Sequence, residues 1–136
     1  MADRMKRTGS DLPPLSRLEQ RIMGIVWNLG ECSAAAVISE HNKTERLAET
    51  TIRTVLANLR KKGYIELVPT IERQQHFKPA VSREKVGKRT LRDLVSGFFG
   101  GSPRHVLTHL IKEEKLSAED LEVLRQLIEE QQKKGR

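Results

Sequence analysis

The sequence predicts a mainly α fold: a winged helix-turn-helix of three helices plus a two-stranded β-hairpin, followed by a three-helix C-terminal dimerisation region. Apolar residues recur at helical spacing up to residue 62, strand-like runs follow between residues 64 and 78, and helical spacing then returns. Aromatic residues make up only 4% of the chain. A core built mainly from Leu, Ile, Val and Ala favours helices packed on helices over a large sheet.

Three helices are expected before the hairpin. The first begins at Ser16, which has capping-box spacing to Glu19, and it ends at Gly30. The second covers residues 34–41 and the third covers residues 49–62. The third lacks a good N-cap, and its inward stripe consists of Ile52, Val55, Leu56 and Leu59.

The hairpin and three further helices complete the predicted elements. The two strands cover residues 64–68 and 74–78, with a turn between them. The fourth helix follows Ser82, the fifth begins at Pro103, a residue favoured in the first helical turn, and the sixth follows Ser117.

Composition divides the chain into three parts. Residues 1–14 are polar, end in two prolines and are expected to form a flexible basic arm. Residues 15–80 are expected to form the winged-helix DNA-binding domain, and residues 81–134 a helical dimerisation domain. The amphipathic helices of the last part cannot bury their apolar stripes alone, so they need the rest of the chain or a second copy. The residues expected to pair two chains are Leu91, Leu94, Val95, Phe98, Val106, Leu110, Leu121, Leu124, Leu127 and Ile128.

Charge and cysteine content restrict the partner and the compartment. The net charge is +7, and its surplus lies in residues 1–104, where a polyanion is the natural partner, although basic residues also serve solubility. Cys32 is the single cysteine, so the chain has no disulfide framework. The sequence shows no signal peptide and no apolar stretch of membrane-spanning length. We expect a cytoplasmic protein without membrane insertion.

The outward face of the third helix predicts a DNA-contacting surface. Thr50, Thr54 and Asn58 lie one turn apart and offer the hydrogen-bonding groups and methyls that distinguish base pairs in a major groove. The alternative is an ordinary polar helix face, which threonine, a mediocre helix former, does not favour. Arg73 and Lys78 of the hairpin suit contacts to the phosphate backbone, but a hairpin that is simply exposed to solvent explains each of them nearly as well. The expected DNA-binding residues are Thr50, Thr51, Arg53, Thr54, Asn58, Lys61, Lys62, Arg73 and Lys78.

Enzyme chemistry is not expected. The sequence has no Gly-rich phosphate loop, nucleophile elbow or zinc-protease signature, so no catalytic residue, cofactor or metal is predicted. His105, His109 and Glu113 lie one turn apart on the fifth helix and could share an ion, but amphipathic helices produce this pattern readily. A winged-helix protein-interaction module and a metal-responsive regulator stay open as alternatives.

Several segments resemble the penicillinase repressor (BlaI/MecI) family of winged-helix transcriptional repressors. The resemblance covers about residues 15–130 and includes the C-terminal tail, which makes it more specific than a winged helix alone. The segments that carry it are LSRLE (15–19), IMGIVW (22–27), TTIRTVL (50–56), LRKKGYI (59–65), LVSGFFGGS (94–102), EEKLS (113–117) and LEVLR (121–125).

The resemblance implies a homodimer that binds a palindromic operator through its third helix and represses transcription, with the last three helices intertwined between subunits. Family repressors of β-lactam resistance are inactivated by cleavage at an Asn-Phe bond in the fifth helix, in a region that reads Thr108-His109-Leu110 here. His109 and Leu110 therefore mark the expected cleavage region, with a membrane sensor-protease as a further partner to test. Since no Asn-Phe bond is present in this region, the resemblance does not extend to cleavage at such a bond or to β-lactam resistance. The copper-responsive relatives have paired C-terminal cysteines, which this tail lacks.

Overall fold

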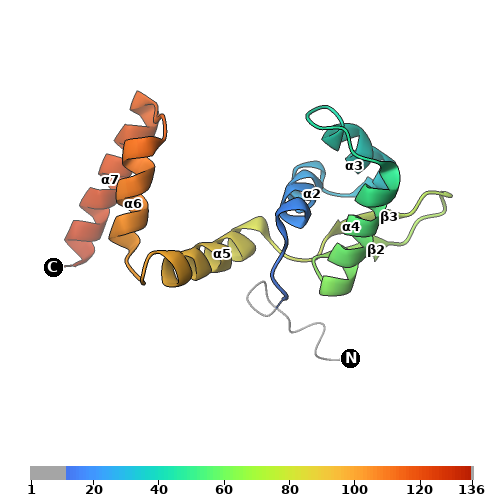
Figure 1. Cartoon of the computed structure of the whole chain (residues 1–136), viewed down its shortest axis with the longest axis horizontal. Helices are drawn as coiled ribbons and strands as arrows, with labels where there is room; N and C mark the ends of the chain where they lie inside the picture. The colour runs from blue at the N-terminus through green and yellow to red at the C-terminus, as the bar shows by residue number, and fades with distance from the viewer. Residues whose placement is uncertain (1–11, 136) are drawn as a thin grey trace. The chain divides into compact units, whose positions relative to one another are not determined.

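The structure is a computed structural model that describes residues 12–135, and its chain divides into two compact units (Figure 1). The first unit ends at Leu91 and the second begins at Arg92, so the division falls inside helix α5 (Arg83–Phe98). The expected boundary followed residue 80. The first half of α5 belongs with the first unit because Val86 is part of its hydrophobic core.

The first unit contains the three expected helices, α2 (Arg17–Leu29), α3 (Ala34–His41) and α4 (Glu49–Lys62). The capping box at the start of α2 is confirmed: the backbone N–H of Glu19 donates to the Ser16 hydroxyl, and the Ser16 N–H donates to the Glu19 carboxylate. The start of α4 has no side-chain cap, as its sequence predicted.

The hairpin is also confirmed, but it belongs to a three-stranded sheet. Strands β2 (Ile65–Val68) and β3 (His76–Pro79) pair antiparallel, with Leu67 opposite Phe77. A short strand β1 (Cys32–Ser33), which the sequence pattern did not predict, pairs with the other side of β3. Its two residues are too few to show a strand-like alternation.

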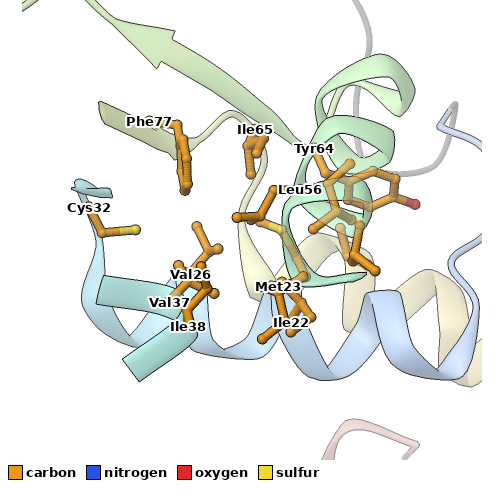
Figure 2. Packing of buried hydrophobic residues seen from close by; sticks show 14 of the residues in the cluster. Ile22, Met23, Val26, Cys32, Val37, Ile38, Leu56, Tyr64, Ile65 and Phe77 are labelled. Atoms are coloured by element: carbon orange, nitrogen blue, oxygen red, sulfur yellow. The ribbon is translucent and has the colours of Figure 1, made fainter. Parts of the chain in front are cut away.

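The core of the first unit lies between the three helices and the sheet. Figure 2 shows Ile65 and Phe77 of the sheet together with Val26 of α2 and Val37 of α3. Leu56 and Leu59 bring α4 onto the same core, and each is almost completely buried. This burial fixes which face of α4 is left outward, because the inward stripe cannot turn away without losing its apolar contacts.

The expectation of a flexible arm over residues 1–14 is wrong for its last three residues. Residues 1–11 lie outside the described part of the chain, but Leu12 is only 2% exposed and belongs to the core. The hydroxyl of Tyr64 donates to the Pro13 carbonyl at 2.6 Å, and Lys62 donates to the Pro14 carbonyl at 3.0 Å. We call residues 12–14 the N-terminal strap, because they contact the first unit before α2 begins.

The second unit contains the rest of α5, helix α6 (Pro103–Glu113) and helix α7 (Ala118–Lys134). Gly100 and Gly101 separate the first two helices with φ of 60° and 81°, as expected for residues that end a helix. Ser117 caps α7 with Asp120 in a second capping box. Within the described residues, no helix combines the length and apolar content that crossing a membrane requires.

Candidate nucleic-acid interface

The outward face of α4 carries the five helix residues expected to contact bases and the adjacent backbone. Ile52, Val55, Leu56 and Leu59 are buried on the opposite face. The five outward residues are all exposed, and they are Thr50, Thr51, Arg53, Thr54 and Asn58. A single rigid helix therefore presents them, and its orientation is set by its buried stripe.

The hydroxyl of Thr54 is oriented by a bond within α4. It donates to the carbonyl of Thr50 at 2.8 Å, a bond that threonine commonly makes to the preceding turn. The donor is therefore used inside the helix, and the oxygen lone pairs and the methyl group are left for an outside partner. Such a group suits a base edge that donates a hydrogen bond, or the methyl of thymine.

The basic residues of α4 fall into two groups. Arg53, Arg60 and Lys61 are exposed, and no acidic side chain among residues 12–135 forms an ion pair with them. Lys62 is different: its ammonium lies 2.7 Å from the Glu19 carboxylate and also bonds to the N-terminal strap. The charge of Lys62 is thus compensated inside the first unit.

Burial and hydrogen bonding act in opposite directions on Glu19. Burial by itself raises the pKa of this carboxyl, but the hydrogen bond from Lys62 and those from Ser16 outweigh it and hold the pKa below the usual glutamate value. The sequence placed Lys62 among the DNA-binding residues because it lies in a basic run. Only the tertiary contact with Glu19 shows its structural role.

The two basic residues expected to contact DNA from the hairpin have different surroundings. Arg73 is exposed in the turn between β2 and β3. The ammonium of Lys78 lies 3.6 Å from the Glu66 carboxylate on the neighbouring strand, and both side chains are about half exposed. An exposed pair at this distance is weak and can exchange for a phosphate contact.

The start of α5 is attached to α2 by contacts that sequence spacing did not reveal. The guanidinium of Arg83 donates to the Gly24 carbonyl at 3.0 Å and to Asn28 Oδ1 at 2.6 Å. It also lies 5.6 Å from the centroid of the Trp27 ring, whose Nε1 donates to the Val81 carbonyl at 3.0 Å. Trp27 thus fixes the segment that leads into α5.

The residues expected to pair two chains are mostly exposed in the single chain. Leu124 and Val95 are half-buried, whereas Phe98 is 83% exposed. Val106 differs from the others because it is buried within its own chain. The remaining exposed members are Leu91, Leu94, Leu110, Leu121, Leu127 and Ile128. So much exposed apolar surface on three consecutive helices is characteristic of a protein–protein interface.

The alternative metal site gains no support from the described residues. Between residues 12 and 135, no three His, Cys, Asp or Glu side chains are grouped so that they could hold an ion. His105, His109 and Glu113 are exposed along α6, where they border an open hollow next to Phe98 and Phe99. His109 and Leu110, the expected cleavage region, lie within this helix.

Comparison with known proteins finds relatives that span most of the chain. The family model described as penicillinase repressor matches residues 15–130. A penicillinase repressor of Staphylococcus aureus is 24% identical over 120 residues, 88% of this chain and 94% of the relative. The methicillin resistance regulatory protein MecI, also of Staphylococcus aureus, is 25% identical over 114 residues, 84% of this chain and 92% of the relative. Among solved structures, a mutant MarR from E. coli complexed with operator DNA aligns with a TM-score of 0.47 and 12% identity, over 85% of this chain and 74% of that one.

Proposed function

The chain belongs to the penicillinase repressor family, and from this premise we propose that it is a sequence-specific transcriptional repressor that binds a palindromic operator as a homodimer. Its named relatives are regulatory repressors and not enzymes. The observation that carries the proposal is the outward face of α4, a single polar surface whose orientation is fixed by its buried opposite side.

In the proposed complex, α4 enters the major groove of the operator. Thr50, Thr54 and Asn58 contact base edges, because they are short, uncharged and one helical turn apart. Thr51 and Arg53 lie beside them and reach the adjacent bases or phosphates. The accepting oxygen and methyl of Thr54 favour positions where a base donates a hydrogen bond or presents a methyl group.

Phosphate contacts position the domain on the duplex. Lys61 supplies one from the end of α4, and Arg73 and Lys78 supply others from the hairpin. Lys62, with its charge compensated by Glu19, stabilises the end of the helix instead of contacting DNA. This arrangement predicts strongly salt-dependent binding, because each phosphate contact releases condensed counterions.

Two copies of the second unit form the proposed dimer. Their exposed apolar side chains on α5, α6 and α7 would be buried against each other, and the free energy of that burial would join two DNA-binding units. Each half-site is then bound weakly, but once one is bound the second contact becomes effectively intramolecular.

Selection of duplexes from a random pool, followed by sedimentation of the complex, tests the proposal. We expect an inverted repeat to be enriched, two chains to bind each duplex, and affinity to fall steeply with salt. Enrichment of no motif would overturn sequence-specific repression. Binding of a partner protein with no salt-dependent DNA affinity would instead support a protein-interaction module.

Relief of repression by proteolysis is a separate part of the proposal. His109 and Leu110 lie inside α6, so a protease would have to unwind this helix before cleaving. Mass spectrometry of the chain in induced cells tests this part. A fragment ending in α6 supports cleavage and a sensor-protease partner, whereas an intact chain under full induction contradicts both.

A further inference from the structure

A groove of about 1150 Å³ runs between α4 and the hairpin strands of the first unit. One wall is formed by residues of α4 that lie about one helical turn apart: Arg53, Ala57 and Lys61. Leu67 and Gln75 line the hairpin wall, and the groove continues to Ala80 at the C-terminal end of the hairpin. Small-molecule sites in proteins commonly enclose roughly 300–1,000 Å³, so this groove is large enough for one.

The charge of this groove is positive. Arg53, Arg60 and Lys61 line it, and no acidic side chain among residues 12–135 pairs with them. Its single carboxylate, Glu66, lies 3.6 Å from the ammonium of Lys78, which offsets its charge. A ligand that enters the groove therefore gains from a negative charge.

Apolar side chains also line the groove. Ala57 and Ala80 are exposed, and Leu67 and Val81 are half-buried, so apolar surface lies in the same groove as the cationic groups. A DNA backbone gains little from apolar surface, because phosphates and sugars are recognised by hydrogen-bond donors and charge. Thr50 and Thr54, which are proposed to contact bases, do not line the groove.

We propose that this groove is a binding site for a small amphipathic carboxylate, with an apolar chain or ring against Leu67 and Val81 and the acid group among Arg53, Arg60 and Lys61. Arg53 also belongs to the proposed DNA-contacting face of α4. Ligand and operator therefore compete for the same residue, and the ligand acts as an inducer. This consequence, unlike binding itself, rests on the proposed function.

Calorimetric titration of the DNA-free full chain with three probes tests the site. Octanoate carries both an apolar chain and a carboxylate, octylammonium carries the chain with the opposite charge, and acetate carries the carboxylate alone. We expect binding of octanoate only. No octanoate binding, or equal binding of octanoate and octylammonium, would overturn the proposal, since the second result indicates adsorption to apolar surface.

Matched variants locate the binding. Ala80→Glu adds a carboxylate to the groove and is expected to weaken octanoate binding about fivefold, whereas Ala35→Glu, at an exposed position of α3, leaves it unchanged. Arg60→Gln removes one cation and is expected to weaken it about threefold, with Arg17→Gln on α2 as its control. Circular dichroism confirms folding of each variant. Equal effects within either pair would place the ligand elsewhere and overturn the site.

Competition with DNA is measured last. Octanoate is expected to release the selected duplex from the wild-type chain but not from Ala80→Glu at the same concentration. If octanoate binds in the groove and the duplex stays bound, the inducer role fails and the site stands. If no duplex is selected at all, the proposed function fails, and the DNA-free titrations still decide the site.

Discussion

The ammonium of Lys62, in the last turn of α4, lies 2.7 Å from the carboxylate of Glu19, in the first turn of α2. The Glu19 side chain is buried, and the same ammonium also bonds to the Pro14 carbonyl of the N-terminal strap. The strap and the start of α2, which are neighbours in sequence, therefore meet the distant end of α4 at one pair of charges. Because α4 is the proposed DNA-contacting helix, this pair helps to hold it in place.

Replacing Lys62 is expected to reduce stability. Lys62→Met leaves the buried Glu19 carboxylate without its cation and should lower the free energy of unfolding by about 1–3 kcal/mol. Lys61→Met, one residue earlier and exposed, is the matched control and should change it by less than about 0.5 kcal/mol. Urea unfolding followed by circular dichroism measures both. An equal effect of the two variants would show that the ion pair contributes nothing.

Stability is also expected to depend on pH through Glu19. Its pKa in the folded chain lies below the unfolded value, so its contribution is complete above the unfolded pKa and is lost as the pH falls through the folded pKa. The stability difference between wild type and Glu19→Gln should therefore shrink as the pH falls from 7 through roughly 5 to 3. Glu31→Gln, at an exposed position, controls for the change of charge. A difference that stays constant with pH would refute this.

Alanine at Gly63 is expected to destabilise the chain. Gly63 ends α4 with φ of 90°, and a Cβ there would lie 3.1 Å from Cδ2 of the buried Leu12. Strain and contact together should cost about 1–2 kcal/mol. Gly24→Ala, inside α2 with no atom within 4 Å of an added Cβ, should instead stabilise by about 0.5–1 kcal/mol. Thermal unfolding measures the change in stability of both variants. A stabilising Gly63→Ala would disprove the role of the left-handed conformation.

Thr54→Ala is expected to lower affinity for the selected operator about three- to tenfold and to leave non-specific binding nearly unchanged. Thr90→Ala is the matched control, because the hydroxyl of Thr90, on α5, makes the same bond to its preceding turn at 2.9 Å. Fluorescence anisotropy on operator and random duplexes gives both affinities. Equal losses on the two duplexes would argue against a base-contacting role.

Leu124→Asp is expected to break the dimer. Leu124 is half-buried on α7 of the single chain, and a carboxylate there would have to be desolvated at the proposed interface. Gln126→Asp, exposed on the same helix, should leave association intact. Sedimentation velocity measures the mass of each variant. A Leu124→Asp chain that still sediments as a dimer would show that this part of α7 does not pair subunits.

Much of the fold follows from short-range patterns. The apolar stripe of α4 predicted bounds that match the structure, the capping box at Ser16 predicted the start of α2, and Ser117 was expected to precede α7. These signals are local, because a helix period and a cap involve residues within a few positions of each other. The outward set on α4 follows from the same periodicity.

Contacts between distant residues could not be predicted in this way. Strand β1 exists because two residues before α3 meet the outer edge of β3. The strap is ordered because Leu12 enters a core assembled from later segments. Arg83 looks like any exposed cation in sequence, and only folding brings it to Trp27 and Gly24.

The sequence by itself determined the order of helices and strands, the inward and outward faces of α4, and the apolar stripes of the second unit. All of these depend on residue periods of a few positions. The tertiary structure alone decided that Lys62 is a structural cation, that Leu12 belongs to the core, and that a positive groove lies between α4 and the hairpin. Each of those depends on distances between residues tens of positions apart, which no local pattern records.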